Sequence, residues 1–179
     1  MKVLLGFCAG VDWLNKKLGQ LSNWLVLVAC VISAGNALIR YLFSASSNAW
    51  LEIQWYLFAG MVMLGASYTL RVNEHVRVDV LYAHYGQRTR LWLDFLGGIL
   101  FLLPMTLIIG WFAWPMVSNS WDIHEVSSNP GGLLRWPVKI LVPVGFLLLS
   151  LQGLSEILKR GAALAGHLDF DAKYEKPLQ

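Results

Sequence analysis

Charged side chains are scarce in this 179-residue chain, in which Asp, Glu, Lys and Arg together make up 14%. Soluble domains average about 25%. Hydrophobic residues make up 56%, above the roughly 45–50% of a soluble domain. An excess of this kind needs a non-aqueous solvent, so the sequence predicts an integral membrane protein.

Other absences exclude several classes of function. The two cysteines, Cys8 and Cys30, are isolated and lack the spacing of a metal site or a disulfide framework. There is no basic tract dense enough to predict a nucleic-acid partner. The Gly-Gly pairs at 97–98 and 131–132 lack the following Lys of a phosphate-binding loop. We expect neither a catalytic site nor a cofactor.

The four histidines, His75, His84, His124 and His167, all lie outside the long apolar runs. A haem-carrying membrane subunit needs axial histidines inside its helices, so the sequence argues against that cofactor. His75 and Asp79 are four residues apart and could share a metal if their segment were helical. Two ligands without a third favour a solvated interfacial pair instead.

Four apolar stretches reach the roughly 20 residues needed to cross a bilayer core of about 30 Å. They cover residues 21–43, 49–71, 90–118 and 136–158. Because lipid offers no partner to backbone groups, we expect an all-α fold with four transmembrane helices in one domain, residues 1–179. Pro104 near the middle of the third stretch predicts a tilt or a kink there.

The segments that flank these stretches are more polar. Residues 1–19 predict an interfacial amphipathic helix rather than a cleaved signal peptide. Its apolar face would carry Leu4, Phe7, Cys8, Val11, Leu14 and Leu18, and its polar face Asp12, Asn15 and Lys16. Asp79 is a candidate N-cap for a short surface helix at 80–87, between the second and third spans. Residues 159–179 would form a cytoplasmic tail.

The distribution of basic residues predicts the orientation. Eleven of the fourteen Lys and Arg residues lie on one side of the predicted spans, and only Arg40, Arg135 and Lys139 lie on the other. The positive-inside rule therefore places both termini and the 72–89 loop in the cytoplasm. The loops at 44–48 and 119–135 would face outward.

Polar residues inside the spans are costly and need a reason. Ser33, Asn36 and Arg40 share one face of the first span. We expect Arg40 to pair with Glu52, which opens the second span at the same depth across a short loop. The alternative is that Arg40 extends to the lipid headgroups.

The second span carries small residues along one side. That side comprises Glu52, Tyr56, Ala59, Gly60, Met63, Ala66 and Ser67. Small residues let another helix approach closely, whether from this chain or from a partner. A transport pathway would instead need broken helices meeting at the midplane or several intramembrane charges, and the sequence has neither.

Several local motifs occur in one order along the chain: "RY.F" at 40–43, "W.E" at 50–52, "LGASYTLR" at 64–71 and "HVRVDVLY" at 75–82. Over roughly residues 20–160 the sequence resembles the small membrane subunit of tripartite ATP-independent periplasmic (TRAP) transporters. The stretch "NPGGLLRWPVK" at 129–139 looks like a subgroup labelled for mannitol or chloroaromatic compounds, which is no substrate assignment. Relatives often have two acids after the tryptophan, whereas here Glu52 is followed by Ile53.

The resemblance implies a bacterial inner-membrane protein that pairs with a larger multi-span permease subunit. That subunit carries the substrate and sodium sites and moves like an elevator, while the small subunit widens and anchors its fixed scaffold. A periplasmic substrate-binding protein delivers the substrate, usually an organic acid. Membrane lipids are the remaining expected partner.

The pattern and the resemblance together give two sets of candidate site residues. Candidates for the partner interface are Arg40, Trp50, Glu52, Tyr56, Gly60, Ser67, Arg71, His75, Arg77 and Asp79. Candidates in the outward loop are Trp121, Asp122, Glu125 and Arg135. Two alternative functions stay open at this point. An independent small exporter would need an acid deep within a span, and the anchor subunit of a redox enzyme would need ligands that the spans do not supply.

Overall fold

The computed structural model describes residues 2–45, 47–74 and 84–167. Within these ranges the chain is helical, with no strand longer than an isolated bridge. The elements are α1 (Lys2–Phe43), α2 (Asn48–Arg71), α4 (Gln87–Gly97), the π-helical turn η1 (Gly98–Leu102), α5 (Leu103–Asp122), α6 (Trp136–Lys139) and α7 (Leu141–Leu164). The all-α prediction is confirmed for this part of the chain.

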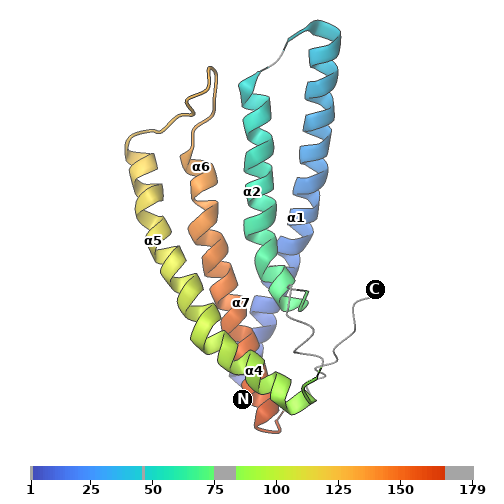
Figure 1. Cartoon of the computed structure of the whole chain (residues 1–179), viewed down its shortest axis with the longest axis vertical. Coiled ribbons are helices and arrows are strands. Elements are labelled where there is room, and N and C mark those ends of the chain that lie inside the picture. The colour runs from blue at the N-terminus through green and yellow to red at the C-terminus, as the bar shows by residue number, and fades with distance from the viewer. Residues whose placement is uncertain (1, 46, 75–83, 168–179) are drawn as a thin grey trace.

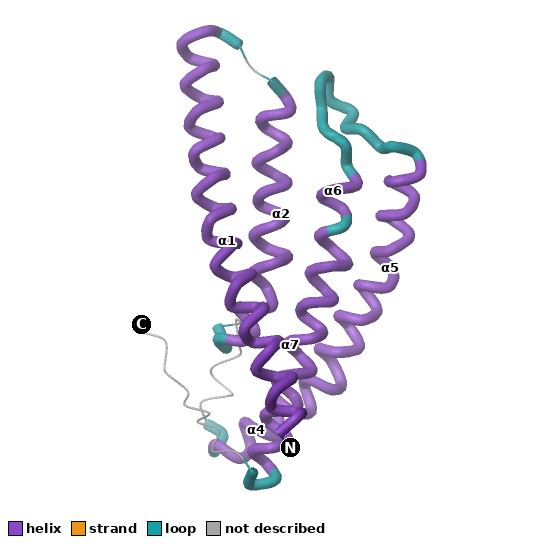
Figure 2. The backbone as a smooth tube through the Cα atoms, turned by 180° about the vertical axis from the view of Figure 1, so that it is seen from behind, coloured by secondary structure: helices purple, strands orange, loops and turns teal. Residues whose placement is uncertain are grey.

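The helices spread apart at one end of the bundle and converge at the other (Figure 1). At the spread end they follow the order α1, α2, α6, α5, which Figure 2 shows from behind. We call this the loop end, because it carries residues 44–45 and 123–135. We call the opposite end, where α1, α4 and α7 meet, the terminal end. Along the bundle α2 packs against α1 and α7, and α7 packs against α5.

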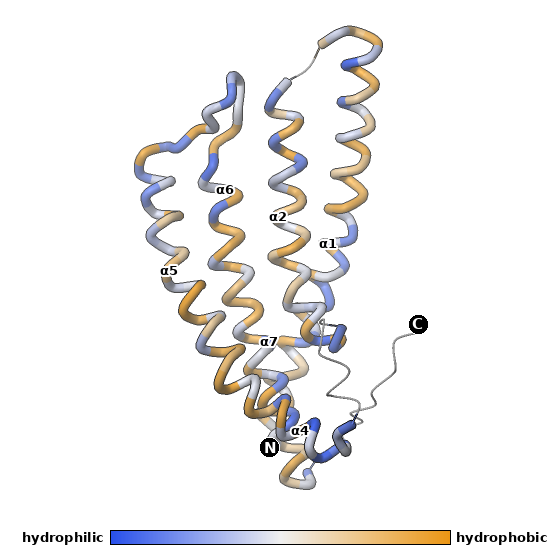
Figure 3. Tube along the Cα trace, in the orientation of Figure 1, coloured by the Kyte–Doolittle hydropathy of each residue, from blue (hydrophilic) through white to orange (hydrophobic). Residues whose placement is uncertain are grey.

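Three helical stretches are long and apolar enough to cross a membrane. They are Val3–Phe43, Gln87–Asp122 and Trp136–Leu164. Helix α2 has 24 residues, about 36 Å at 1.5 Å per residue, but it is less apolar than those three. Hydrophilic residues gather toward the two ends of the bundle (Figure 3). These features are those of a helical membrane protein.

The predicted break after residue 19 is absent, because α1 continues over 42 residues from Lys2 to Phe43, about 63 Å. Gly19 lies within this helix at a close contact rather than at a helix end. A Cβ atom there would lie 2.5 Å from Cγ of Tyr68 on α2. The assignment of faces was also wrong for Asn15, which was predicted on the polar face and is fully buried.

Pro104, where the sequence predicts a tilt or a kink, follows a local departure from α geometry. The π-helical turn Gly98–Leu102 separates α4 from α5 immediately before this residue. Proline has no N–H and its ring collides with the carbonyl four residues earlier, and a π turn accommodates both defects. In the fourth stretch, α6 and α7 meet at Ile140, where Pro143 leaves the Lys139 carbonyl without its helical donor.

Asparagine ends α2 without a glycine. Asn73 has φ 63°, a left-handed conformation that Asn tolerates better than most residues. Its N–H donates to the Leu70 carbonyl, and the Glu74 N–H donates to the Thr69 carbonyl, as in a Schellman motif. The predicted N-cap Asp79 and the first half of the predicted surface helix, residues 80–83, lie outside the described residues. Residues 84–86 form a turn, and α4 begins only at Gln87.

Candidate functional site

The loop between α5 and α6 folds back on itself as a short hairpin. Residues 129–132, Asn-Pro-Gly-Gly, make its turn, in which the Gly132 N–H donates to the Asn129 carbonyl at 3.0 Å. Gly131 has φ 71°, and a positive φ after proline is typical of a type II turn. Val126 and Leu134 form an antiparallel bridge behind it. These four residues therefore form the tight turn that reverses the chain and closes the hairpin.

The carboxylate of Glu52, in the first turn of α2, holds this hairpin. It accepts hydrogen bonds from the Ser127 hydroxyl, from Nδ2 of Asn129 at 2.9 Å and from the Leu133 N–H at 2.7 Å. Only 3% of Glu52 is exposed. Hydrogen bonds to an ionised carboxylate are roughly twice as strong as neutral ones. Three of them on one side chain fix the hairpin to the start of α2.

Two further side chains of α2 contact the hairpin. The Tyr56 hydroxyl donates to the Leu134 carbonyl at 2.6 Å, and Nδ2 of Asn48 donates to the Pro130 carbonyl at 2.9 Å. Glu52 and Tyr56, both predicted to face a partner subunit, therefore bind a loop of their own chain.

The predicted ion pair between Arg40 and Glu52 is wrong. Among the described residues no ion pair joins them, and the Glu52 carboxylate is bound by the hairpin instead. Arg40 lies in the last turn of α1 with an exposed side chain, which agrees with the alternative that it extends to the headgroups. The pair was predicted because Arg40 and Glu52 lie at the same depth in the membrane. That argument could not reveal that a loop about 80 residues further along the chain supplies the hydrogen-bond donors to Glu52.

The remaining outward-loop candidates surround the base of the hairpin. Glu125 forms an ion pair with Lys139 of α6. The Lys139 ammonium, which donates to this carboxylate, is the main cause of a lowered pKa of Glu125. Trp121 packs edge-on against Trp136, with ring centroids 4.5 Å apart. Asp122 is the exposed last residue of α5.

A cavity of about 190 Å³ lies between α2 and α6 beside the hairpin. It is lined by Glu52, Trp55, Tyr56, Ser127, Arg135, Val138 and Lys139. Three of the predicted candidates, Glu52, Tyr56 and Arg135, thus meet at one place.

A chain of buried amide and hydroxyl groups crosses the bundle at the terminal end. The Ser67 hydroxyl of α2 donates to Oδ1 of Asn15 at 2.8 Å. Nδ2 of Asn15, on α1, donates to Oε1 of Gln152 on α7 at 2.6 Å. All three side chains are fully buried. One run of hydrogen bonds therefore ties α1, α2 and α7 together.

Gln152 connects this run of hydrogen bonds to a group of charged side chains. Its Nε2 donates to Oδ1 of Asp12 at 2.9 Å and to Oε1 of Glu156 at 3.0 Å. The Lys159 ammonium lies 2.7 Å from Oδ2 of Asp12 and 2.8 Å from Oε1 of Glu156. Both carboxylates therefore have a cation and an amide as partners.

Arginines from two helices complete the group. Arg160 contacts Glu156 at 2.8 Å and reaches Asp94 of α4 at 3.3 Å. Arg71, at the end of α2, lies 4.0 Å from Asp12. With the lysine, these residues make three cations and three carboxylates, so the cluster is neutral. Buried charges are tolerated when they are paired in this way. We call this cluster with the Ser67–Asn15–Gln152 run the terminal network.

The terminal network was not predicted as a site. Ser67 and Arg71 were assigned to a partner interface, but Ser67 binds Asn15 and Arg71 contacts Asp12 within this chain. Gln152 and Glu156, four residues apart in an otherwise apolar span, were the signal that could have revealed the network.

The other predicted residues have different surroundings. A Cβ atom at Gly60 would lie 3.1 Å from Leu25 of α1, so this glycine allows the two helices to approach. Trp50 is half exposed. His75, Arg77 and Asp79 lie outside the described residues, so the predicted His75–Asp79 pair does too. In the ranges that are described, no three His, Cys, Asp or Glu side chains are grouped to hold a metal ion.

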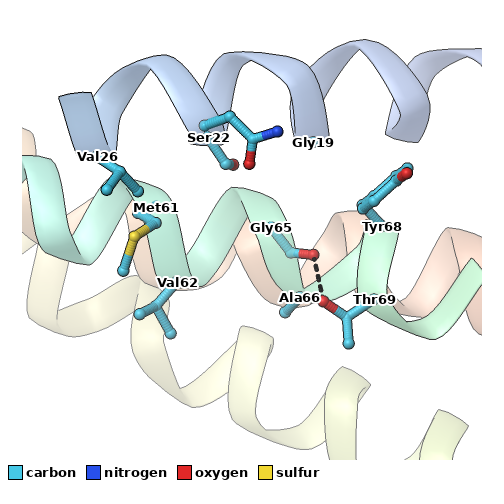
Figure 4. A pocket seen from close by; sticks show the side chains of 10 residues that line it. Gly19, Ser22, Val26, Met61, Val62, Gly65, Ala66, Tyr68 and Thr69 are labelled. Atoms are coloured by element: carbon cyan, nitrogen blue, oxygen red, sulfur yellow. Dashed lines mark hydrogen bonds between the residues drawn. The ribbon is translucent and has the colours of Figure 1, made fainter. Parts of the chain in front are cut away.

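Small residues also shape a groove of about 390 Å³ between α1 and α2 (Figure 4). It is lined by Gly19, Ser22, Asn23, Val26, Met61, Val62, Gly65, Ala66, Tyr68 and Thr69. The Thr69 hydroxyl donates to the Gly65 carbonyl of its own helix at 3.2 Å. The hydroxyl is thereby satisfied beside an apolar surface.

Comparison with known proteins gives one result. Residues 28–162 match the family described as tripartite ATP-independent periplasmic transporters, DctQ component. Neither the curated proteins nor the solved structures yield a match. Because the match covers more than half of the chain, the protein belongs to this family and is a small permease subunit of a TRAP transporter.

Proposed function

We propose that this subunit is a non-catalytic scaffold for the large, elevator-type permease subunit of its transporter. In this proposal the complex takes up an organic acid with sodium, after a periplasmic binding protein delivers it. The observation that carries the proposal is the terminal network, in which polar side chains of α1, α2, α4 and α7 bind one another. Polar groups used in this way fix helices in place.

The exposed surface supports the same role. The most apolar 18-residue window of α1 is not buried anywhere within the chain. Large side chains such as Val31 (63% exposed) and Leu38 (59% exposed) lie on this surface. Lipid or a second membrane subunit must cover this surface, because exposing so much apolar area to water is unfavourable. A scaffold needs such a surface for its partner.

We further propose that α2 crosses the membrane with the three more apolar stretches, giving four spans. Both termini would then lie in the cytoplasm of a bacterial inner membrane and the hairpin in the periplasm, as the distribution of Lys and Arg favours. Single cysteines at Ser128 and His167, both exposed, test this after Cys8 and Cys30 are changed to Ser. A membrane-impermeant maleimide should label Ser128→Cys in intact cells and His167→Cys only after lysis. The reverse pattern would contradict the orientation.

Reconstitution tests the scaffold role. The small subunit, the large subunit and both together are placed in liposomes, with the binding protein, a candidate organic acid and an inward sodium gradient. We expect the two subunits to copurify and uptake to require both. Robust uptake by the small subunit alone would show that it forms its own pathway.

A further inference from the structure

The cavity at the loop end reaches the surface of the bundle at Trp55, an exposed residue of its lining. Its α2 wall consists of Glu52, Trp55 and Tyr56, and its α6 wall includes Val138 and Lys139. Glu52 is buried and bound to the hairpin, whereas Trp55 is 63% exposed. The cavity thus runs from the buried carboxylate of Glu52 to the exposed indole ring of Trp55.

Arg135 is the cation of this cavity that has hydrogen-bonding capacity left. Lys139 already pairs with Glu125, and the Glu52 carboxylate accepts three hydrogen bonds from the hairpin. The backbone N–H of Arg135 donates to the backbone carbonyl of Glu125. In the part of the chain that is described, the Arg135 guanidinium forms no hydrogen bond or ion pair. A guanidinium has five N–H donors in a planar fork that matches the oxygens of a phosphate.

Tryptophans indicate the depth of the cavity in a membrane. Trp50, Trp55 and Trp121, all at the loop end, are 50%, 63% and 52% exposed. Exposed indole rings favour the level of the lipid headgroups. A cavity that reaches the surface at this level lies beside the phosphates of the lipid, and the carboxylates of Glu52 and Glu125 are already bound.

We propose that this cavity binds the phosphodiester of a phospholipid, with the Arg135 guanidinium as the main donor. Trp55 and Val138, at the rim, contact the glycerol and the first carbons of the acyl chains. The lipid then lies between α2 and α6. This site is independent of the large subunit and of the solute that the transporter carries.

Lipid titration of the purified subunit in detergent tests the site, with bound ligand counted by native mass spectrometry. The probes are phosphatidylglycerol, diacylglycerol, which lacks the phosphate, and glycerol 3-phosphate, which lacks the acyl chains. We expect phosphatidylglycerol to bind at least about tenfold more tightly than either probe. Arg135→Gln should weaken its binding by about ten- to a hundredfold, the loss expected for charge-assisted hydrogen bonds. Arg88→Gln is the matched control, since Arg88 is exposed on α4 at the opposite, terminal end of the bundle and does not line the cavity.

Five results would overturn the proposal. Equal phosphatidylglycerol binding by Arg135→Gln and wild type would remove the role of the guanidinium. Diacylglycerol binding as tightly as phosphatidylglycerol would leave only an apolar site, and glycerol 3-phosphate binding as tightly would identify a soluble phosphate as the ligand. Arg135-dependent binding of the periplasmic binding protein, with unchanged lipid binding, would identify a protein contact instead. If Arg135→Gln does not fold, Arg135→Lys is used: it keeps the charge but not the fork, and unchanged affinity would again refute the site.

Discussion

Replacing Gln152 by leucine tests whether the terminal network stabilises the fold. Leucine has a similar size but cannot accept the hydrogen bond from Nδ2 of Asn15 at 2.6 Å. It also cannot donate to Asp12 and Glu156, which are 2.9 and 3.0 Å from Nε2 of Gln152. The substitution therefore removes three hydrogen bonds and leaves one buried amide donor without a partner.

The expected loss of stability follows from these three bonds. A buried donor left unpaired costs about 1–3 kcal/mol. Asp12 and Glu156 keep Lys159 as a partner, so each loses only the value of a hydrogen bond within a membrane protein, about 0.6 kcal/mol on average. The sum predicts that Gln152→Leu lowers the free energy of unfolding by about 2–4 kcal/mol.

Equilibrium unfolding in mixed micelles, followed by circular dichroism, measures this loss. Gln20→Leu is the control, because Gln20 is exposed on α1, and it should change stability by less than about 0.5 kcal/mol. The double variant Asn15→Leu, Gln152→Leu should lose less than the sum of the single variants, because the unpaired donor is then absent. If Gln152→Leu were no less stable than Gln20→Leu, the network would not hold the helices together.

Three further predictions concern other contacts. Gly145→Ala should lower the free energy of unfolding by about 1–3 kcal/mol, because the new Cβ would lie 2.9 Å from a backbone oxygen of α2, whereas Gly97→Ala, in open space, should not destabilise the protein; equal melting temperatures would refute this. Glu52→Gln places an amide against the hairpin's donors, so hydrogen exchange of the hairpin amides should become about tenfold faster, and unchanged exchange would show that Glu52 does not hold the hairpin. The lowered pKa of Glu125 adds stability above the carboxyl's unfolded value of about 4.5 and loses it as the pH falls through the lower folded value; the melting temperature of wild type should thus fall more steeply below pH 4.5 than that of Glu125→Gln, and parallel curves would contradict the contribution.

The sequence predicted only some of the helix ends, since α4 begins at Gln87, α5 ends at Asp122 and α7 ends at Leu164, three to six residues beyond the predicted spans. The first two helices end at Phe43 and Arg71, and α6 begins at Trp136, each as predicted from apolar length. Asn73 after α2 and Pro137 at the start of α6 act within a few residues of themselves. The interruption near Pro104 has the same local origin.

The positions of polar groups could not be predicted in the same way. The N-terminal segment was interpreted as a surface helix because its polar residues were expected to face water, but Asp12 and Asn15 bind side chains of α2 and α7, and of the predicted polar face Lys16 alone stays exposed. Asn15 is therefore buried while Phe7 and Trp13, at 41% and 62% exposure, face outward. The partners of Glu52 were missed for another reason, since a hairpin some 75–81 residues away in the sequence supplies them.

The Glu52–hairpin contacts and the terminal network lie at opposite ends of α2. Their separation suggests a structural role for both in a scaffold subunit. Glu52, in its first turn, is bound to the hairpin that joins α5 to α6, and Ser67, near its last turn, is bound to α1. Fifteen residues separate the two, about 22 Å along the helix. Shifting α2 along its axis by even one residue would break the bonds at both ends at once, whereas apolar side chains between them could repack at little cost. Hydrogen bonds at both ends therefore set the position of α2 along its axis, as the proposed role of a rigid support for the large subunit would require.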